Sequence, residues 1–418
     1  MTAVAATERL VRAPAEVRRA RILGVTYLLL AVATFFLFAH GTEGDTTFRF
    51  GERPGDLDWT FSPAVLATFS AIVFGFLGGV QLTKGLGRKT NIVLAAAMVL
   101  FAASFLAWAT AGKSLSIVGM LVTTVAAATP IAFGALSGVM CERVAVINIG
   151  IEGMLLTGAF TGAVVGTVAS PLLGILGATL AGGLMALILA VLAIRYRVDQ
   201  IIAGVVINIL ALGLTSFISS QLLVRNREAL NNPGIYRPIT IPLLSDIPFI
   251  GTILFNQNIF IYVLYTLVVV FTFALFRTKW GLQSRAVGEH PKAADTLGIN
   301  VYRRRYINVF IGGLIAGFGG AYFTLGSVGA FNENMTAGRG FIGLAAMIFG
   351  RWHPVGALAA ALVFGFADSL QVRLGILDTG IPSEFLLMAP YLVTIVVVAG
   401  VVGQARPPAA DGQPYIKE

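Results

Sequence analysis

Long apolar runs separated by short polar stretches dominate the chain. A helix that crosses the hydrocarbon layer needs about 20 apolar residues. Runs of this scale predict spans at 22–39, 63–83, 91–111, 115–140, 144–168, 171–194, 201–224, 259–276, 307–330, 354–371 and 384–403. A further run, 341–350, is too short to cross alone at about 1.5 Å per residue, so it is a re-entrant half-helix or a crossing completed by its neighbours. The pattern predicts an all-α, polytopic transmembrane helical bundle of about 10–12 spans with broken or re-entrant helices.

Composition and charge agree with a membrane protein. Charged residues make up 12% of the chain and hydrophobic residues 57%, whereas a soluble domain carries about 25% charged residues. If the N-terminus is cytoplasmic and 341–350 crosses, most of the 29 Lys and Arg residues lie inside, as the positive-inside rule requires. The first outer loop holds the acidic residues Glu43, Asp45, Glu52, Asp56 and Asp58. The net charge of +9 therefore indicates topology rather than nucleic-acid binding, and both termini are expected in the cytoplasm.

The chain divides into four expected parts. Residues 1–21 form an Arg-rich cytoplasmic tail that is disordered or lies on the membrane surface. Residues 22–113 hold three spans with few polar side chains, which favours an accessory packing role. Residues 114–404 hold the polar features and form the transmembrane core, and residues 405–418 form a second cytoplasmic tail.

The sequence offers little for catalysis or metal binding. Cys141 is the single cysteine, and His40, His290 and His353 are scattered over different loops. The nearest resemblance to a phosphate-binding loop, ATAGKS at 109–114, lacks the first glycine and follows a span rather than a strand. We therefore expect no enzyme activity, no metal site and no cofactor bound by this chain; any ATP used for transport must be bound by a partner subunit.

A short helix is predicted in the middle of the basic segment 277–306. Pro291 suits a first helical position, and Gly298 suits the residue just past a helix end. A helix of under two turns is not stable alone, so other contacts must hold it. A rigid stub on the cytoplasmic face is typical of a docking element for a soluble partner.

Two features stand out in segment 134–166. Gly158, Gly162 and Gly166 recur every four residues, and such a face allows close helix packing in lipid. If 144–168 is helical, Glu152 lies roughly 13 Å beyond Arg143, near the middle of a core about 30 Å thick. A carboxyl group there is a functional candidate or a structural acceptor that satisfies backbone groups at a helix break, and both interpretations stay open.

Polar residues also gather near the ends of other spans. Segment 329–358 joins a Gly-rich span to the short run 341–350. The outer loop 225–258 is long, proline-broken and partly apolar, and loops of this length are often functional. It caps a transport path, faces an external partner or forms a packed plug.

Four motifs occur in a recognisable order: NIGIEGM, IPLLSDIPFIG, AVGEHPKAADTLGIN and ENMTAGRGFIGLAAMIFGRWHPVGAL. Together they resemble the permease subunits of bacterial ABC importers, in the branch for nucleosides and simple sugars that is akin to the ribose and branched-chain amino acid permeases. The resemblance covers about residues 114–404. It implies that the short helix couples the permease to a cytoplasmic ATP-binding subunit, and that the polar residues near 148–153 form a broken helix beside the translocation path.

The resemblance and the residue types define two candidate sites. The coupling site comprises Glu289, Pro291, Lys292, Ala293, Ala294 and Gly298, in which the small Ala293 and Ala294 allow close approach of a partner. The translocation path comprises Asn148, Gly150, Glu152, Gly153, Asn208 and Asn332, the last two chosen because amide side chains suit a nucleoside.

The implied assembly lies in the bacterial plasma membrane. It contains this chain, a second permease subunit expected to be a different chain, a cytoplasmic ATP-binding subunit and an external substrate-binding lipoprotein. A small-molecule substrate then crosses by alternating access. The main rival is a proton-coupled secondary transporter that uses Glu152 as its proton carrier; an embedded enzyme finds no support in the residues.

Overall fold

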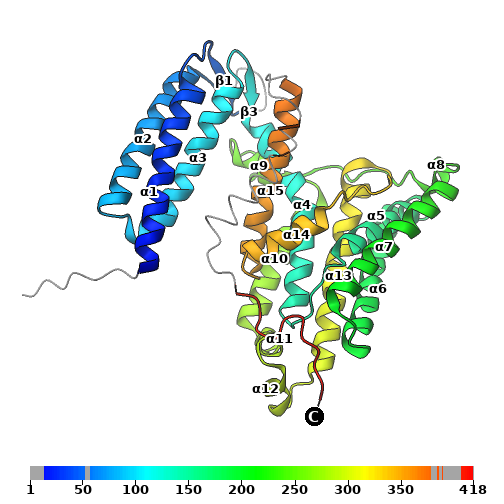
Figure 1. Cartoon of the computed structure of the whole chain (residues 1–418). Helices are drawn as coiled ribbons and strands as arrows, with labels where there is room; N and C mark the ends of the chain where they lie inside the picture. Colours follow the sequence, from blue (N-terminus) through cyan, green and yellow to red (C-terminus); the bar gives the residue numbers. More distant parts are fainter. Residues whose placement is uncertain (1–13, 52–56, 378–383, 386–387, 389–405, 418) are drawn as a thin grey trace, which may run out of the picture. The chain divides into compact units, whose positions relative to one another are not determined.

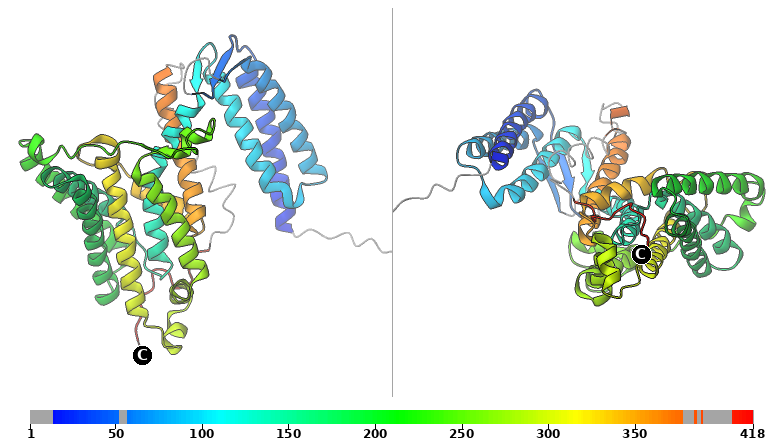
Figure 2. Two further views of the ribbon diagram at one scale, coloured as in Figure 1. Left: turned by 180° about the vertical axis from the view of Figure 1, so that it is seen from behind. Right: turned by 60° about the horizontal axis from the view of Figure 1, so that its bottom comes forward.

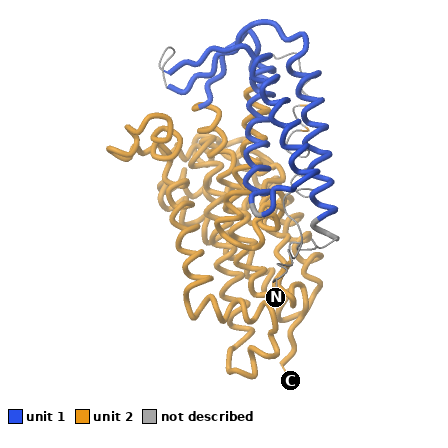
Figure 3. The backbone as a smooth tube through the Cα atoms, turned by 90° about the vertical axis from the view of Figure 1, so that its left-hand side faces the viewer, with its two compact units in different colours: residues 1–117, 374–381 blue, residues 118–373, 382–418 orange. Residues whose placement is uncertain are grey.

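The computed structural model describes residues 14–51, 57–377, 384–385, 388 and 406–417. The chain forms two compact units, 1–117 with 374–381 and 118–373 with 382–418 (Figure 3). Within the described residues, ten helices are long and apolar enough to cross a membrane. They match ten of the predicted spans, while 384–403 lies almost wholly outside the described residues. The prediction of a polytopic helical bundle is confirmed.

The first unit contains three long helices and a small sheet. The helices are α1 (Pro14–Thr34) with its π-helical extension η1 (Phe35–Ala39), α2 (Pro63–Thr83) and α3 (Thr90–Ala109), the last preceded by η2 (Gly87–Lys89). The sheet has the order β2 (Asp58–Phe61), β1 (Thr46–Arg49), β3 (Ser114–Ser116), in which β1 pairs antiparallel with β2 and parallel with β3. Because α1 begins at Pro14, residues 14–21 are helical, and the expectation of a disordered tail is wrong for them, while the placement of this tail on the membrane surface stays a prediction.

One hydrogen bond and two aromatic contacts join η1, α2 and α3. Ser104 Oγ donates to Ser70 Oγ at 2.8 Å and joins α3 to α2 inside the unit. The ring of Phe38 lies 5.7 Å from that of Phe101 and 5.2 Å from that of Trp108, measured between centroids. Such side chains stabilise a helical bundle, and they agree with the packing role expected for these spans.

The second unit is a helical bundle with short elements at both ends; Ile117 of α4 and residues 374–377 of α15 belong to the first unit. Its elements are α4 (Ile117–Glu142), α5 (Ile151–Val168), α6 (Pro171–Ala190) with η3 (Val191–Arg195), α7 (Gln200–Ile218) with η4 (Ser219–Leu223), α8 (Arg227–Leu230), β4 (Ile239–Thr240), α9 (Ile250–Phe255), β5 (Asn256–Gln257), α10 (Ile259–Arg277), α11 (Lys279–Glu289), α12 (Pro291–Thr296), α13 (Val301–Ala321) with η5 (Tyr322–Val328), α14 (Arg339–Phe349) and α15 (Pro354–Leu377). Both side views place α11 and α12 at one end of this bundle and α8 at the other (Figures 1 and 2).

Three helices of this unit approach at nearly backbone distance. A Cβ atom added to Gly158 of α5 would lie 2.5 Å from the carbonyl oxygen of Gly317 in α13. A Cβ atom added to Gly182 of α6 would lie 2.5 Å from the carbonyl oxygen of Gly313 in α13. Such distances exclude any side chain. The packing interpretation of the glycine face is confirmed at Gly158.

Candidate functional site

The chain between α4 and α5 is not helical. Helix α4 ends at Glu142 and α5 begins at Ile151, and Ala145 takes a left-handed conformation with φ +61°. The prediction of a helix from residue 144 is therefore wrong, and so is the helical path used to place Glu152. The physical reason is that side chains of α7 form hydrogen bonds with the backbone N–H and C=O groups of the break. Irregular backbone inside a membrane protein requires such partners.

Two α7 side chains hold this break. Gln200 Oε1 accepts from the Ile147 amide at 2.7 Å. Asn208 uses both ends of its amide: Oδ1 accepts from the Gly153 amide at 2.8 Å, and Nδ2 donates to the Ile149 carbonyl at 2.9 Å. Asn208 thus joins the two sides of the break. Gln200 was not among the predicted residues, and its only sequence signal is a polar position at the start of a span.

Asn148 is buried rather than facing an open path. Its side chain has no exposed surface, and Nδ2 lies 3.4 Å from Cys141 Sγ and 3.6 Å from Met154 Sδ. Its Oδ1 has no hydrogen-bond partner among the residues that the structure describes. Gly150 is the N-cap residue of α5.

Glu152 lies in the first turn of α5 and reaches the N-terminus of α14. Its Oε1 accepts from Thr336 Oγ1 at 2.6 Å and from the Gly338 amide at 2.8 Å, and its Oε2 accepts from the Gly340 amide at 2.6 Å. The residue is 7% exposed. A carboxylate at two helix N-termini is favoured by the partial positive charge of both. This geometry favours the structural interpretation of Glu152.

The predicted path residues therefore divide into two groups. Asn148, Gly150, Glu152, Gly153 and Asn208 come together around the break and the start of α14. Asn332 is exposed in the turn before α14, and its side chain takes no part in the hydrogen bonds that hold Glu152.

The short helix has the predicted ends. Helix α12 runs from Pro291 to Thr296, and Gly298 follows in a left-handed conformation with φ +81°. The amide of Gly298 donates to the Asp295 carbonyl at 2.8 Å. His290 is the N-cap residue, a role that the sequence does not indicate, and its Nδ1 accepts from the Ala293 amide at 3.1 Å.

The two alanines of α12 face opposite ways. Ala293 is exposed, whereas Ala294 is only 2% exposed and belongs to an apolar cluster with Val287 and Val301. The expectation that both alanines offer a surface to a partner is thus wrong for Ala294, because its small size serves packing within the chain. Leu297, which the sequence analysis did not select, is 81% exposed; a leucine in an otherwise polar segment was its signal.

Glu289 and the basic residues near it contact other parts of the same chain. The Glu289 carboxylate accepts from the Ala409 amide at 3.2 Å. The guanidinium groups of Arg143 and Arg285 lie 5.3 and 5.1 Å from the centroid of the Phe276 ring. Burial, with the charge of Arg285 added, lowers the pKa of Arg143, and the charge of Glu289 opposes this. Burial, followed by the charge of Arg143, lowers the pKa of His353, so this imidazole is neutral at pH 7.

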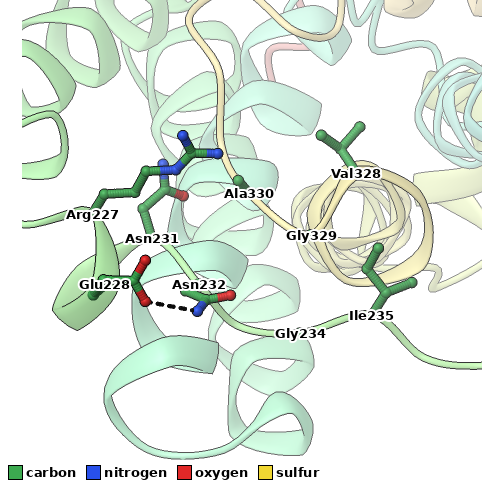
Figure 4. A pocket seen from close by; sticks show the side chains of 9 residues that line it. All are labelled: Arg227, Glu228, Asn231, Asn232, Gly234, Ile235, Val328, Gly329 and Ala330. Atoms are coloured by element: carbon green, nitrogen blue, oxygen red, sulfur yellow. Dashed lines mark hydrogen bonds between the residues drawn. The ribbon is translucent and has the colours of Figure 1, made fainter.

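A cavity of about 440 Å³ lies at the opposite end of the unit from α12. Figure 4 shows its polar wall, where Arg227 and Glu228 of α8 and the following Asn231 and Asn232 face the cavity. Asn232 Nδ2 donates to Glu228 Oε2 at 3.1 Å. None of the predicted path residues lines this cavity, although the polar run NREALNN at 226–232 was a usable signal.

The opposite wall is formed by the end of η5 and the residues after it, Val328 to Ala330 (Figure 4). The two walls are fastened by Asn231, whose Nδ2 donates to the Phe331 carbonyl at 2.9 Å and whose Oδ1 accepts from the Phe331 amide at 2.6 Å. The cavity is thus lined by backbone that Asn231 holds together and by three exposed polar side chains, those of Arg227, Glu228 and Asn232. Across the described part of the chain, no group of His, Cys, Asp and Glu is arranged to hold a metal ion.

Comparison with known proteins decides the family. Residues 120–399 match the family model described as branched-chain amino acid transport system / permease component. The chain belongs to this permease family. This permease is 44% identical over 304 residues to the guanosine ABC transporter permease protein NupQ of Bacillus subtilis, covering 70% of the chain and 95% of the relative. It is 41% identical over 299 residues to the nucleoside ABC transporter permease protein NupC of Lactococcus lactis, covering 69% and 94%.

A more distant relative is the putative glucose ABC transporter permease protein TsgC13 of Haloferax volcanii, 37% identical over 257 residues and covering 61% of the chain and 77% of the relative. No solved structure matches this permease. The resemblance found in the motifs is confirmed, as is the expectation of a transport subunit rather than an enzyme, since the matched family consists of permease components. The protein is a multi-pass membrane protein.

Proposed function

We propose that this permease is the membrane-spanning subunit of an ABC importer for nucleosides or related simple sugars. The observation that supports this most is the identity above 40% with two relatives named for guanosine and nucleoside transport, over nearly their whole length. The substrate crosses by alternating access, ATP is bound by a separate cytoplasmic subunit, and a second permease chain and an external binding lipoprotein complete the transporter. The assembly lies in the bacterial plasma membrane, with α12 and both termini in the cytoplasm.

The proposal assigns coupling to the exposed face of α12. Pro291 and Gly298 set the helix ends, Lys292 and Ala293 face outward, and Leu297 projects beside them. An exposed leucine on a short rigid helix suits an apolar pocket in a soluble subunit, because docking would remove its apolar surface from water. Glu289 orients the C-terminal segment and has no direct contact with the ATP-binding subunit in this scheme.

The rival mechanism uses Glu152 as a proton carrier. A carrier must exchange its proton with water on both sides of the membrane, whereas this carboxyl group is buried and accepts three hydrogen bonds from α14 and the preceding turn. Uptake and release of a proton by Glu152 would require those hydrogen bonds to break in each transport cycle. The arrangement favours a fixed structural carboxylate and an external energy source.

The deciding experiment is purification of this permease from its native membrane in mild detergent. The recovered complex is then reconstituted into vesicles, and the uptake of radiolabelled guanosine is measured. We expect an ATP-binding subunit in stoichiometric amount and uptake that requires ATP. Uptake by the chain alone, without ATP and abolished by a protonophore, would contradict the proposal and support the proton-coupled rival.

Replacement of Leu297 by aspartate is expected to lower ATP-driven uptake about tenfold, which corresponds to about 1.4 kcal/mol of lost docking energy. The charge would enter the apolar contact proposed for the ATP-binding subunit. The matched control is Leu243→Asp, because Leu243 is 83% exposed in the outer loop. Equal uptake by the two variants, at equal amounts of folded protein, would show that α12 does not dock in this way.

The cavity beside α8 is proposed to receive the substrate on the outer face. A carboxylate and an amide can accept from and donate to the hydroxyl and ring N–H groups of a nucleoside, and binding sites use a few such convergent groups. We expect Glu228→Ala to reduce uptake about fivefold, since one charged hydrogen-bond acceptor contributes about 1 kcal/mol or more.

The control for this variant is Asp246→Ala, which removes an exposed carboxylate of the same outer loop. Uptake is measured with the binding lipoprotein at saturating concentration, so that its own affinity does not limit the rate. If both variants transport like the unaltered permease, the cavity is not on the path.

A further inference from the structure

We propose that the C-terminal segment, residues 406–417, clamps α12 onto α13 and so makes the transmission of motion from α12 to the membrane helices efficient. This inference rests on the proposed coupling role of α12. From the sequence the segment was expected to be only a polar tail. In the structure it crosses the end of the bundle, where the end-on view shows it in red among α4, α11 and α13 (Figure 2).

The segment is hydrogen-bonded to α11 at its start. The Ala410 amide donates to the Gly288 carbonyl at 3.0 Å, and the Ala409 amide donates to the Glu289 carboxylate at 3.2 Å. The approach is close, because a Cβ atom on Gly288 would lie 3.4 Å from Pro408 Cβ. These bonds fix the segment directly beside the N-terminus of α12.

The middle of the segment covers a buried arginine. Arg305 of α13 is 1% exposed, and its Nη1 donates to the Gln413 carbonyl at 3.1 Å. A buried guanidinium group is costly unless acceptors and counter-charge surround it. The nearby Asp411 supplies that charge: burial raises the pKa of its carboxyl group to about 6, while hydrogen bonds with Glu142 and the Gly412 backbone, and then the charge of Arg305, act to lower it. The segment therefore supplies the acceptor for Nη1 of Arg305, whereas its Nε and Nη2 have no hydrogen-bond partner among the residues that the structure describes.

Tyr415 joins the segment to the inner face of α12. It is 5% exposed and belongs to the apolar cluster that contains Ala294, Val287 and Val301. Its ring centroid lies 5.3 Å from that of Tyr302, whose hydroxyl donates to the Tyr415 carbonyl at 3.3 Å. The cluster explains how a six-residue helix, unstable alone, is held with its inward alanine fixed.

Without the segment, α12 would be attached to α13 mainly through the turn at Gly298. That turn has a left-handed glycine, is closed by backbone hydrogen bonds from the Gly298 and Ile299 amides, and ends in the Asn300 cap of α13, so only these local bonds would oppose a rotation of α12. A force applied to the exposed face of α12 would then be absorbed by rotation of the helix. Lys417, whose Nζ lies 3.7 Å from Asp295 Oδ1, adds an exposed contact that contributes little by itself. Tyr415 and Arg305 are thus the main positioning residues.

The test uses the complete reconstituted transporter and measures guanosine uptake per ATP hydrolysed. We expect Tyr415→Ala to lower this ratio about fivefold, within the range of coupling energies that such contacts control, while the ATP-binding subunit co-purifies in unchanged amount. Tyr415→Phe keeps the ring in the cluster and should retain the ratio. The matched control is Tyr196→Ala, since Tyr196 is 70% exposed at the end of η3.

An unchanged ratio in Tyr415→Ala and in a chain ending at residue 405 would overturn the clamp. Loss of the ATP-binding subunit from the Tyr415→Ala complex would also overturn it, because the segment would then be a docking surface. Hydrogen exchange separates this inference from the proposed function. If the unaltered complex shows no ATP-driven uptake, the proposed function fails. The clamp is then tested at the Ile299 amide, which donates to the Ala294 carbonyl at 3.1 Å. Faster hydrogen exchange at this amide in the chain ending at residue 405 would support the clamp, and unchanged exchange would refute it.

Discussion

Replacement of Gly317 by leucine is expected to leave almost no folded permease. A Cβ atom at Gly317 would lie 2.3 Å from the Ala178 carbonyl oxygen and 3.0 Å from the Gly182 backbone. Both obstacles are main-chain atoms of α6, which cannot rotate away as a side chain can. Overpacking a core with side chains costs about 1–3 kcal/mol, and we expect this backbone collision to exceed that range because α13 must separate from α6.

The measurement is the yield of monodisperse permease by size exclusion in mild detergent, together with its thermal midpoint. Gly213→Leu is the matched control, since a Cβ atom on Gly213 of α7 meets nothing within 4 Å. That control should be neutral or slightly stabilising, because glycine inside a helix is about 1 kcal/mol less favourable than alanine. A Gly317→Leu variant that elutes and melts like the unaltered permease would refute the close approach of α6 and α13.

The spans and the short helix could be predicted because their signals are local. Ten apolar runs became helices of membrane length, since composition over about 20 residues decides whether a segment prefers lipid. The ends of α12 followed from Pro291 and Gly298, whose backbone preferences act within one turn. Each of these predictions needed only neighbouring residues.

The parts that could not be predicted depend on contacts between distant segments. The interruption before α5 is satisfied by Gln200 and Asn208, which lie more than fifty residues further along the chain. Ala294 is buried in the same apolar cluster as Tyr415, and nothing in the polar C-terminal composition indicated that this tyrosine enters the core. Hydrophobic periodicity and helix-capping residues describe one helix or strand at a time. They give no information on which face of that element a distant segment covers.

Replacement of Glu152 by alanine is expected to destabilise the permease strongly. The change leaves the Thr336 hydroxyl and the Gly338 and Gly340 amides without their acceptor, and each buried unsatisfied group costs about 1–3 kcal/mol. The start of α14 would lose its cap, and α14 would separate from α5. Glu333→Ala is the control, because Glu333 is an exposed carboxylate in the same turn. The thermal midpoint in detergent is the measurement.

The Glu152→Gln variant separates the structural role from proton transport. Glutamine keeps one oxygen acceptor but presents an NH₂ group to the remaining donors, so we expect a thermal midpoint between those of the alanine variant and the unaltered permease. Uptake should fall only in proportion to the folded protein and should remain driven by ATP when a protonophore collapses the proton gradient. A Glu152→Gln permease that melts normally yet transports nothing would contradict this view, because a fixed cap contributes through folding, whereas a proton carrier acts through each proton that it releases.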